Sequence, residues 1–161
     1  MPTAQLDAFI SGDRDAARRL VDYRIPPSFP GTCALGLIRF RREQLSRQPE
    51  RAPWLLRAIV LRETRAMVGF VNFHGPPGSN SIGARDAVEL GWTVFPSQRR
   101  KGYATETGRA LMEWATTEHG IRRFISSTTP GNGASLRVHE KLGFVRTGQI
   151  VDGEIIFELR R

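Results

Sequence analysis

Residues 94–106 decide how this chain folds, and they read Val94-Phe95-Pro96-Ser97-Gln98-Arg99-Arg100-Lys101-Gly102-Tyr103-Ala104-Thr105-Glu106. An apolar run from Ala87 to Phe95 stops at a proline, three cations and a glycine follow, and a helical pattern then begins. Backbone N–H groups at the start of a helix have no partner within the helix, and the helix dipole favours negative charge there. The pattern therefore predicts a strand, a basic turn and a helix that together bind a phosphate or pyrophosphate.

The composition of the 161 residues is typical of a globular protein, and we expect one domain over residues 1–161. No stretch is long and apolar enough for a membrane span, and the first residues lack the pattern of a signal peptide. The single cysteine, Cys33, excludes an internal disulfide and favours a reducing compartment. We therefore expect a cytoplasmic protein with no membrane partner.

The formal net charge is +8, and Lys101 and Lys141 are the only lysines among the cations. Such a balance is typical of proteins that bind a polyanion, such as nucleic acid or an anionic cofactor. The arginines are spread from Arg14 to Arg161 without a long basic block, so most of them indicate a solvated surface. No sequence pattern of a nucleic-acid-binding module is present, which makes nucleic acid the weaker interpretation.

Hydrophobic periodicity and turn residues predict the elements in chain order. They are a helix over 14–23, a helix capped by Thr32 that reaches Leu45, strands over 54–62, 67–73 and 87–95, a helix over 105–119, a strand over 123–129, a helix over 132–142, and strands over 145–151 and 154–159. Asp152-Gly153 predicts a two-residue hairpin turn between the last two strands. Gly91, inside a strand, indicates a bulge or a close approach of another backbone. The order predicts an α+β or mixed α/β fold.

Three linked motifs resemble those of a known family. The turn Arg99-x-x-Gly102-x-Ala104 resembles the Gln/Arg-x-x-Gly-x-Gly/Ala turn of the GNAT superfamily of acyl-CoA-dependent N-acetyltransferases. The strings 88–96, 101–106 and 130–144 are similar to the branch that includes the RimJ/RimL ribosomal-protein N-terminal acetyltransferases. The resemblance is strongest from 88 to 144. It implies the GNAT fold, in which a central, mostly antiparallel mixed sheet is splayed at a bulge and flanked by helices.

The resemblance also implies the ligand, acetyl-CoA (coenzyme A), and the residues that would hold it. The pyrophosphate would lie on the turn and the helix start, at Arg99, Arg100, Lys101, Gly102, Tyr103, Ala104 and Thr105. The pantetheine would pair with the splayed strand at Trp92, Thr93 and Val94, and the backbone N–H of Val94 would face the thioester carbonyl. Asn132 would bond the pantetheine, although local physics equally predicts a helix N-cap. No metal is expected.

Direct acetyl transfer needs a group that takes a proton from the amine, and Glu89 is the first candidate. It lies in the strand that leads to the cofactor turn, and partial burial would raise its pKa. The alternative is a structural carboxylate that faces solvent or pairs with an arginine. Glu154 and Asp152, in the terminal hairpin, are rivals, because the RimL-like branch assigns the role to a glutamate near Glu154. Glu106 is expected to complement the helix dipole.

The departing thiolate gains from a proton donor. In the family, position 139 often holds a tyrosine for this purpose, whereas this chain has His139, which we interpret as a packed or exposed side chain. The RimJ/RimL-like branch has a serine at the place of Ser135, so Ser135 is the better candidate. Cys33 lies far from the motifs, and we expect a buried, inert thiol there.

These observations favour an acetyl-CoA-dependent N-acetyltransferase that acts by direct transfer in a ternary complex. The acceptor would be a protein N-terminus or a small-molecule amine, and the net charge disfavours polycationic acceptors at long range. One alternative is a GNAT-fold protein that binds acyl-CoA as a sensor without turnover. A second, weaker alternative is a basic nucleic-acid-binding module. The sequence leaves a homodimer open.

Overall fold

The computed structural model describes residues 1–161, which divide into two compact units, 1–70 and 71–161. The strands belong to one six-stranded mixed sheet in the order β1-β2-β3-β4-β6-β5. Their bounds are β1 Arg57–Val60, β2 Met67–Phe73, β3 Ala87–Val94, β4 Arg123–Thr128, β5 Val145–Val151 and β6 Glu154–Arg160. The chain combines this mixed sheet with five α-helices, so the expected α+β class is confirmed. None of the helices combines the length and hydropathy needed to cross a lipid bilayer.

The first unit holds three α-helices, α1 Thr3–Ser11, α2 Arg14–Arg19 and α3 Thr32–Arg47, followed by a 3₁₀ helix over Pro49–Trp54. Helix α1 packs against α2 and α3 and buries Leu6 and Phe9. The ring of Phe9 meets that of Phe29 edge-on at 5.2 Å. This aromatic contact helps to anchor α1, since helices as short as α1 and α2 are not stable alone.

The sequence patterns were wrong about several boundaries in this unit. Helix α1 was not expected, and α2 ends at Arg19 rather than Tyr23. Thr32 is the first helical residue and not the cap, because Gly31 occupies the N-cap position without a side-chain bond. The expected strand from residue 54 begins only at Arg57, since the 3₁₀ helix occupies the preceding residues.

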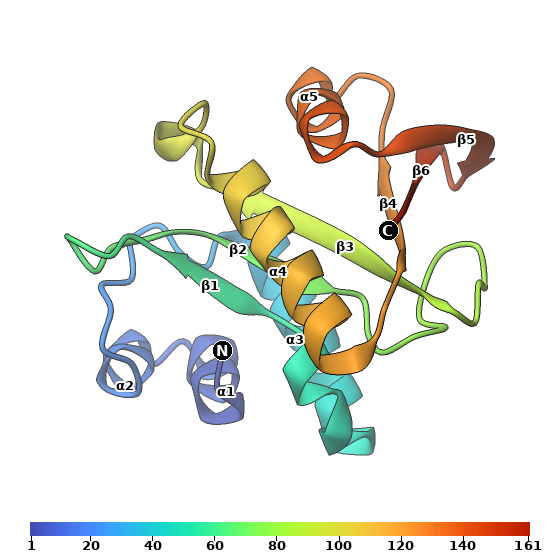
Figure 1. Ribbon diagram of the computed structural model, residues 1–161. Coiled ribbons are helices and arrows are strands. Elements are labelled where there is room, and N and C mark those ends of the chain that lie inside the picture. Colours follow the sequence, from blue (N-terminus) through green and yellow to red (C-terminus); the bar gives the residue numbers. More distant parts are fainter. The chain divides into compact units, whose positions relative to one another are not determined.

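The second unit is built around α4 (Tyr103–His119) and α5 (Gly133–Leu142), which pack against each other. Figure 1 shows α4 crossing β3, with which it is in contact, and α5 above β4. A Cβ at Gly108 would stand only 3.1 Å from Leu142 Cδ1, so the glycine permits the close approach of the two helices. Leu111, Met112 and Ala115 form the buried face of α4, as the sequence pattern predicts.

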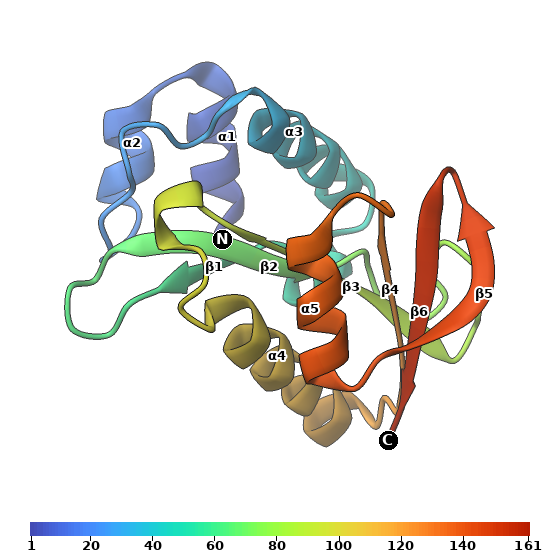
Figure 2. The same ribbon diagram turned by 90° about the horizontal axis from the view of Figure 1, so that it is seen from above.

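Strands β3 and β4 are paired at one end and separate at the other. Their parallel register covers Ala87↔Arg123, Val88↔Phe124 and Glu89↔Ile125. Beyond Glu89, β3 continues to Val94 without a β4 partner, while β4 continues alongside β6. The expected splay is therefore present, and the gap between these strands is visible in Figure 2.

Gly91 does not mark a close approach of another backbone, as the sequence pattern suggested. A Cβ there would lie 3.5 Å from Nε2 of His74 and 3.8 Å from Oδ1 of Asn72, both side-chain atoms. These are ordinary van der Waals distances. The glycine therefore lies beneath the His74 ring, on the face of β3 that also carries Glu89.

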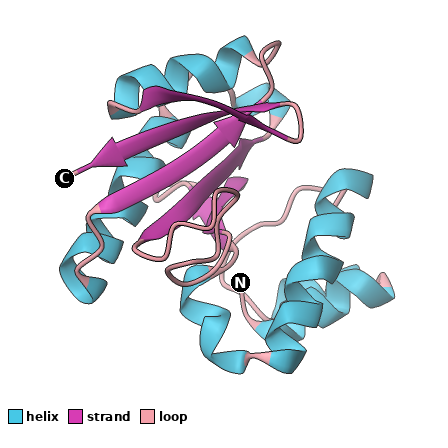
Figure 3. Ribbon diagram, turned by 90° about the vertical axis from the view of Figure 1, so that its right-hand side faces the viewer, coloured by secondary structure: helices cyan, strands magenta, loops and turns pink.

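The antiparallel strands β4, β6 and β5 complete the sheet, and Figure 3 shows β6 as the arrow that ends at the C-terminus. Asp152 and Gly153 have φ angles of 51° and 79°, as the predicted two-residue turn requires. The β5–β6 register shifts between Arg146 and Ile150, around Gly148 with φ 84°. At this sheet edge Val145 and Ile150 expose 65% and 68% of their surfaces.

At the paired end of β3 and β4, Arg123 links three adjacent segments. Its guanidinium donates to Asp86 at 2.9 Å, just before β3, and to Glu158 on β6 at 2.8 Å. The Arg123 side chain is 21% exposed and that of Glu158 16%, so this ion pair is only partly screened by water. The hydrogen bond from Arg123 is the main cause that lowers the pKa of the Glu158 carboxyl.

We expect Arg123→Ala to lower the free energy of unfolding by about 1 to 3 kcal/mol, because two carboxylates lose a partly buried, hydrogen-bonded partner. Urea unfolding at neutral pH measures this change. Arg122→Ala is the matched control, since Arg122 is exposed and precedes β4 by one residue. Equal stability of the two variants would contradict the proposed link.

Candidate active site

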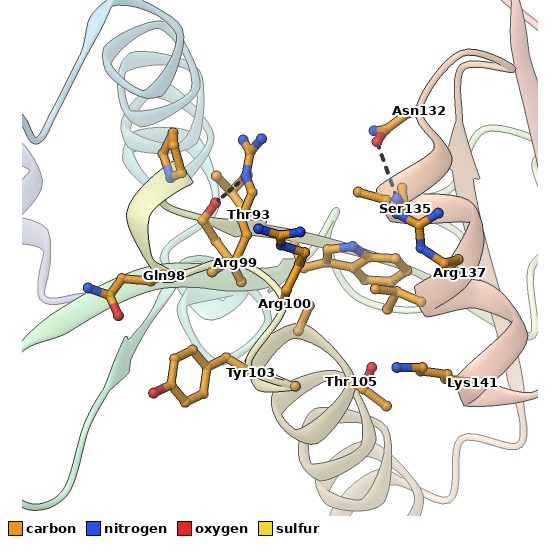
Figure 4. A pocket seen from close by; sticks show the side chains of 17 residues that line it. Thr93, Gln98, Arg99, Arg100, Tyr103, Thr105, Asn132, Ser135, Arg137 and Lys141 are labelled. Atoms are coloured by element: carbon orange, nitrogen blue, oxygen red, sulfur yellow. Dashed lines mark hydrogen bonds between the residues drawn. The ribbon is translucent and has the colours of Figure 1, made fainter.

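A cavity of about 590 Å³ opens where β3 leaves β4. Its walls come from the end of β3, the turn over 96–102, the start of α4, and α5 along most of its length. Figure 4 shows side chains of the turn on one side of the cavity and those of α5 on the other. The cofactor residues named from the sequence line it with the exception of Lys101, and these are Trp92, Thr93, Val94, Arg99, Arg100, Gly102, Tyr103, Ala104, Thr105 and Asn132.

The N-terminus of α4 lines the cavity and has no side-chain cap. Gly102 is the N-cap with φ 88°, and no side chain caps the helix. The N–H of Glu106 bonds the Gly102 carbonyl at 3.0 Å, which leaves the N–H groups of residues 103–105 at the uncapped helix start. A Cβ at Gly102 would meet nothing within 4 Å, so space for a ligand remains above the turn. Unpartnered N–H groups with an open approach are a suitable site for phosphate oxygens.

Four cations line the cavity: Arg99, Arg100, Arg137 and Lys141. Nε of Arg99 donates to the Val94 carbonyl at 3.1 Å, which ties the turn to the end of β3. Lys101 lies outside the lining and donates from Nζ to Gln98 Oε1 at 3.0 Å. The sequence reasoning missed Arg137 and Lys141. Their spacing of four on one helix, two and six residues after Ser135, is the signal that could have revealed them.

The start of α5 places two further predicted residues at the cavity. Oδ1 of Asn132 accepts the N–H of Ser135 at 3.2 Å, and Figure 4 draws this bond as a dashed line between the two labelled residues. Asn132 is thus the N-cap that local physics predicts, and its amide group also lies at the cavity. Ser135 lines the cavity as well. The structure therefore brings the predicted proton donor and the predicted cofactor turn into one site.

Glu89 lies outside the cavity lining and is only 1% exposed. Its carboxylate accepts the Ser81 N–H at 2.6 Å and faces Nδ1 of His74 at 3.4 Å. Burial is the largest single influence and raises the pKa of Glu89, but the contacts with His74 and Ser81 together leave that pKa below its usual value. The expectation of a raised pKa was therefore wrong, because those donors stabilise the carboxylate.

Glu89 and Glu154, the two rival carboxylates, meet at one hydroxyl. Ser127 on β4 has its Oγ 3.1 Å from Glu89 Oε1 and 2.5 Å from Glu154 Oε2. Glu89 is thus neither solvent-facing nor paired with an arginine. Sequence reasoning missed Ser127 and His74, because nothing in their local patterns distinguishes them from ordinary strand residues.

His139 is a packed core residue, as interpreted from the sequence, and it is 0% exposed. Its ring stacks on Phe157 at 4.1 Å and lies 4.9 Å from that of Trp92. Nδ1 lies 2.8 Å from the Ser135 carbonyl, which only accepts, so Nδ1 carries the proton and Nε2 accepts from Ser126 Oγ at 2.9 Å. Burial lowers the pKa of His139 to about 4, so the ring is neutral at physiological pH.

The remaining candidates lie in structural positions. Glu106 lies in the first turn of α4, where its charge complements the helix dipole. Asp152 forms the β5–β6 turn. Cys33 is exposed on α3, so the expectation of a buried thiol was wrong. No group of three or more His, Cys, Asp or Glu side chains is arranged to hold a metal ion.

A comparison with known families identifies the class of protein to which this α+β fold belongs. The profile of the family described as "Acetyltransferase (GNAT) domain" matches residues 4–145. The chain therefore belongs to the GNAT acetyltransferase family.

Curated relatives include two uncharacterized N-acetyltransferases of Bacillus subtilis (strain 168). YjdG is 29% identical over 140 residues, which are 87% of this chain and 80% of YjdG. YnaD is 31% identical over 90 residues, which are 56% of this chain but only 49% of YnaD. The chain thus matches about half the length of the latter relative.

Solved structures share the fold at low sequence identity. The Microcin C7 self-immunity acetyltransferase MccE, solved with acetyl-CoA and AMP, has a TM-score of 0.62 at 16% identity and covers 99% of this chain and 89% of its own. The ribosomal-protein-S5-alanine acetyltransferase from Vibrio fischeri has a TM-score of 0.59 at 16% identity, with coverage of 98% and 87%. Ribosomal-protein acetyltransferases are therefore among the structural neighbours of this chain. The resemblance to the GNAT superfamily is confirmed.

We expect the buried His139 to make the protein less stable in mild acid. The unfolded chain binds a proton at this residue below its ordinary pKa of 6.5, whereas the folded chain does so only near 4. Stability is therefore lost as the pH falls through this window, and the loss between pH 7.5 and pH 5 from this group is about 2 kcal/mol.

Urea unfolding of the wild type and of His139→Gln at both pH values measures how much His139 contributes to the loss of stability. The variant should be less stable at pH 7.5 but should lose less stability on acidification. If His139→Gln shows the same loss between the two pH values as the wild type, the neutral buried ring is not the cause.

Proposed function

We propose that the protein transfers an acetyl group from acetyl-CoA directly to a primary amine within a ternary complex. The observation that carries this proposal is the cavity at the splay, which joins an unpaired strand end to the uncapped start of α4. The match to the GNAT family and the acetyl-CoA in the MccE structure support it. We also propose that the chain belongs to the RimJ/RimL-like branch of this family.

The residues at the cavity fit coenzyme A. The N–H groups at the start of α4 would take the pyrophosphate, and Arg100, Arg137 and Lys141 would neutralise its charge. Trp92, Thr93 and Val94, which have no β4 partner, would pair with the pantetheine, and Asn132 would bond it from α5. When bound, acetyl-CoA supplies a thioester carbonyl as the electrophile.

The chain would supply the groups that the transfer needs. The backbone N–H of Val94 would stabilise the negative charge that develops on the carbonyl oxygen. Ser135 would donate a proton towards the departing sulfur. An α-amine has an ordinary pKa near ~8 and a lysine amine near ~10, so the acceptor must lose a proton before it attacks, and Glu89 or Glu154 would receive it.

Direct transfer is favoured over a covalent acetyl-enzyme, because no cysteine lines the cavity. The only cysteine, Cys33, lies on α3 in the first unit. A GNAT fold that binds acyl-CoA as a sensor without turnover is the alternative, since the same cavity would serve it.

The acceptor would be a protein N-terminus or a small-molecule amine, and a net charge of +8 disfavours polycations at long range. We also propose that both compact units form one acetyltransferase domain, because the family match spans the boundary between them. A cytoplasmic location fits a chain whose only cysteine is unpaired.

Acetyl-CoA should raise the melting temperature of the protein, and thiol should be released when an amine is added. The panel comprises an alanine-initiated tripeptide, its N-acetylated form as the blocked control, kanamycin and spermidine. Release with the free tripeptide and not with the blocked one supports transfer to an α-amine. Stabilisation without release on any amine would favour the sensor, and no stabilisation would contradict both.

We expect Lys141→Ala and Arg137→Ala each to raise the dissociation constant of coenzyme A about 5- to 10-fold, because each removes one cation from an anionic ligand. Arg122→Ala is the control, since Arg122 lies three residues beyond the C-terminal end of α4, and this helix of 17 residues is roughly 25 Å long at 1.5 Å per residue. Isothermal titration calorimetry at low ionic strength measures the change. Equal affinity of all three variants would place the pyrophosphate elsewhere.

A further inference from the structure

Glu89, Ser127 and Glu154 form one hydrogen-bonded chain across three neighbouring strands, β3, β4 and β6. Ser127 Oγ lies 3.1 Å from Glu89 Oε1 and 2.5 Å from Glu154 Oε2. The three residues lie far apart in the sequence, and all belong to the second compact unit. The two candidate proton acceptors are therefore parts of a single arrangement.

A serine hydroxyl has one proton and can donate it to only one oxygen at a time. If both carboxyl groups were ionised, one of them would face a lone pair of Ser127 rather than its proton. Both contacts become hydrogen bonds only when one carboxyl carries a proton and donates it to Ser127, which then donates to the other. The geometry is therefore that of two carboxyl groups that share one proton.

The surroundings decide which carboxyl stays ionised. Oε2 of Glu89 accepts the Ser81 N–H at 2.6 Å and lies 3.4 Å from Nδ1 of His74. Ser81 faces Glu89 from the 75–86 loop, and His74 faces it from the end of β2. No such donor is seen on Glu154 apart from Ser127. Glu89 therefore stays ionised, and Ser127 donates to it.

We propose that Ser127 joins Glu89 and Glu154 into one proton acceptor for the amine, an inference that rests on the proposed acetyl transfer. Ser127 acts as a positioning residue. Glu89 is the last β3 residue paired with β4, three residues before Trp92 of the cavity, or about 10 Å at 3.3 Å per residue. The acceptor amine would therefore pass its proton to the pair through water.

In this step an N–H bond of the ammonium breaks, and its electron pair stays on nitrogen. The proton moves to the doubly ionised pair, which then holds it across Ser127. The C–N bond then forms as the C–S bond breaks, and the nitrogen gives its second proton to solvent. Ser135 donates a proton to the departing thiolate and regains one from solvent. The pair later releases its proton to water, so the protein returns to its starting state.

The titration of the pair tests the shared proton without any acceptor. We expect ¹³C NMR of the glutamate carboxyl carbons to show two coupled steps for Glu89 and Glu154 in the wild type. In Ser127→Ala the upper step should move down by about one pH unit, because the singly protonated pair loses its bridge. Ser127→Thr, which keeps the hydroxyl, should restore it. Unchanged titration in Ser127→Ala would overturn the proposal.

The pH–rate profile tests the same pair in turnover with the alanine-initiated tripeptide. We expect Ser127→Ala to lower kcat about 10-fold and to move the acidic limb to lower pH by about one unit, with the KM for acetyl-CoA unchanged. Ser127→Thr should recover most of the rate. The matched control is Ser46→Ala, because Ser46 is exposed on α3 and bonds only a backbone carbonyl.

A third test compares the kcat of the two single glutamate variants with that of the double variant. Glu89→Gln and Glu154→Gln should each lower kcat by about 100-fold, and the double variant should be no slower than the slower single one. Independent losses that multiply would overturn the shared acceptor. If the NMR coupling is present but no amine is acetylated, the proposed function fails and the shared proton stands.

Discussion

The early end of the β3–β4 pairing is the constraint on which the rest of the structure depends. Three residue pairs hold the strands together, and after Glu89 and Ile125 their backbones separate. Residues 92–94 therefore reach the cavity with a free strand edge on the β4 side. Because unpaired backbone groups need partners, such an edge is prepared for an extended ligand that can replace a strand.

Two features keep this opening from spreading along the sheet. Arg123 ties Asp86 and Glu158 together at the paired end, so separation is confined to the other end. On the far side of the gap, the neutral ring of His139 fastens α5 to β4 through Ser126. The gap is thus wide where α5 begins and closed where β4 begins.

The sequence predicted the centre of the fold well and its periphery poorly. The strand–turn–helix over 87–119 has a clear change of period, a proline and flanking glycines, and its boundaries agree with the structure within two residues. Helix α1 was missed because its apolar residues follow no strong helical spacing. The cavity lining was predicted in most positions, since the motif residues lie close together in the chain.

The relation between Glu89 and Glu154 could not be predicted from the sequence. They are 65 positions apart, and their shared partner Ser127 lies on a third strand whose pairing only the folded chain defines. The direction of the Glu89 pKa shift depended on His74 and on one backbone N–H from the 75–86 loop. Local patterns report periodicity and turns, whereas these contacts depend on the register between distant strands.

The irregular outer strand β5 has a consequence for how copies of the protein can meet. A regular, exposed edge strand offers a row of backbone donors and acceptors to another chain and invites uncontrolled sheet growth. Here the register shift between Arg146 and Ile150, around Gly148, interrupts that row although Val145 and Ile150 are exposed. This edge is a poor template for a seventh strand, so the protein resists fibre-like stacking at this side despite its apolar residues.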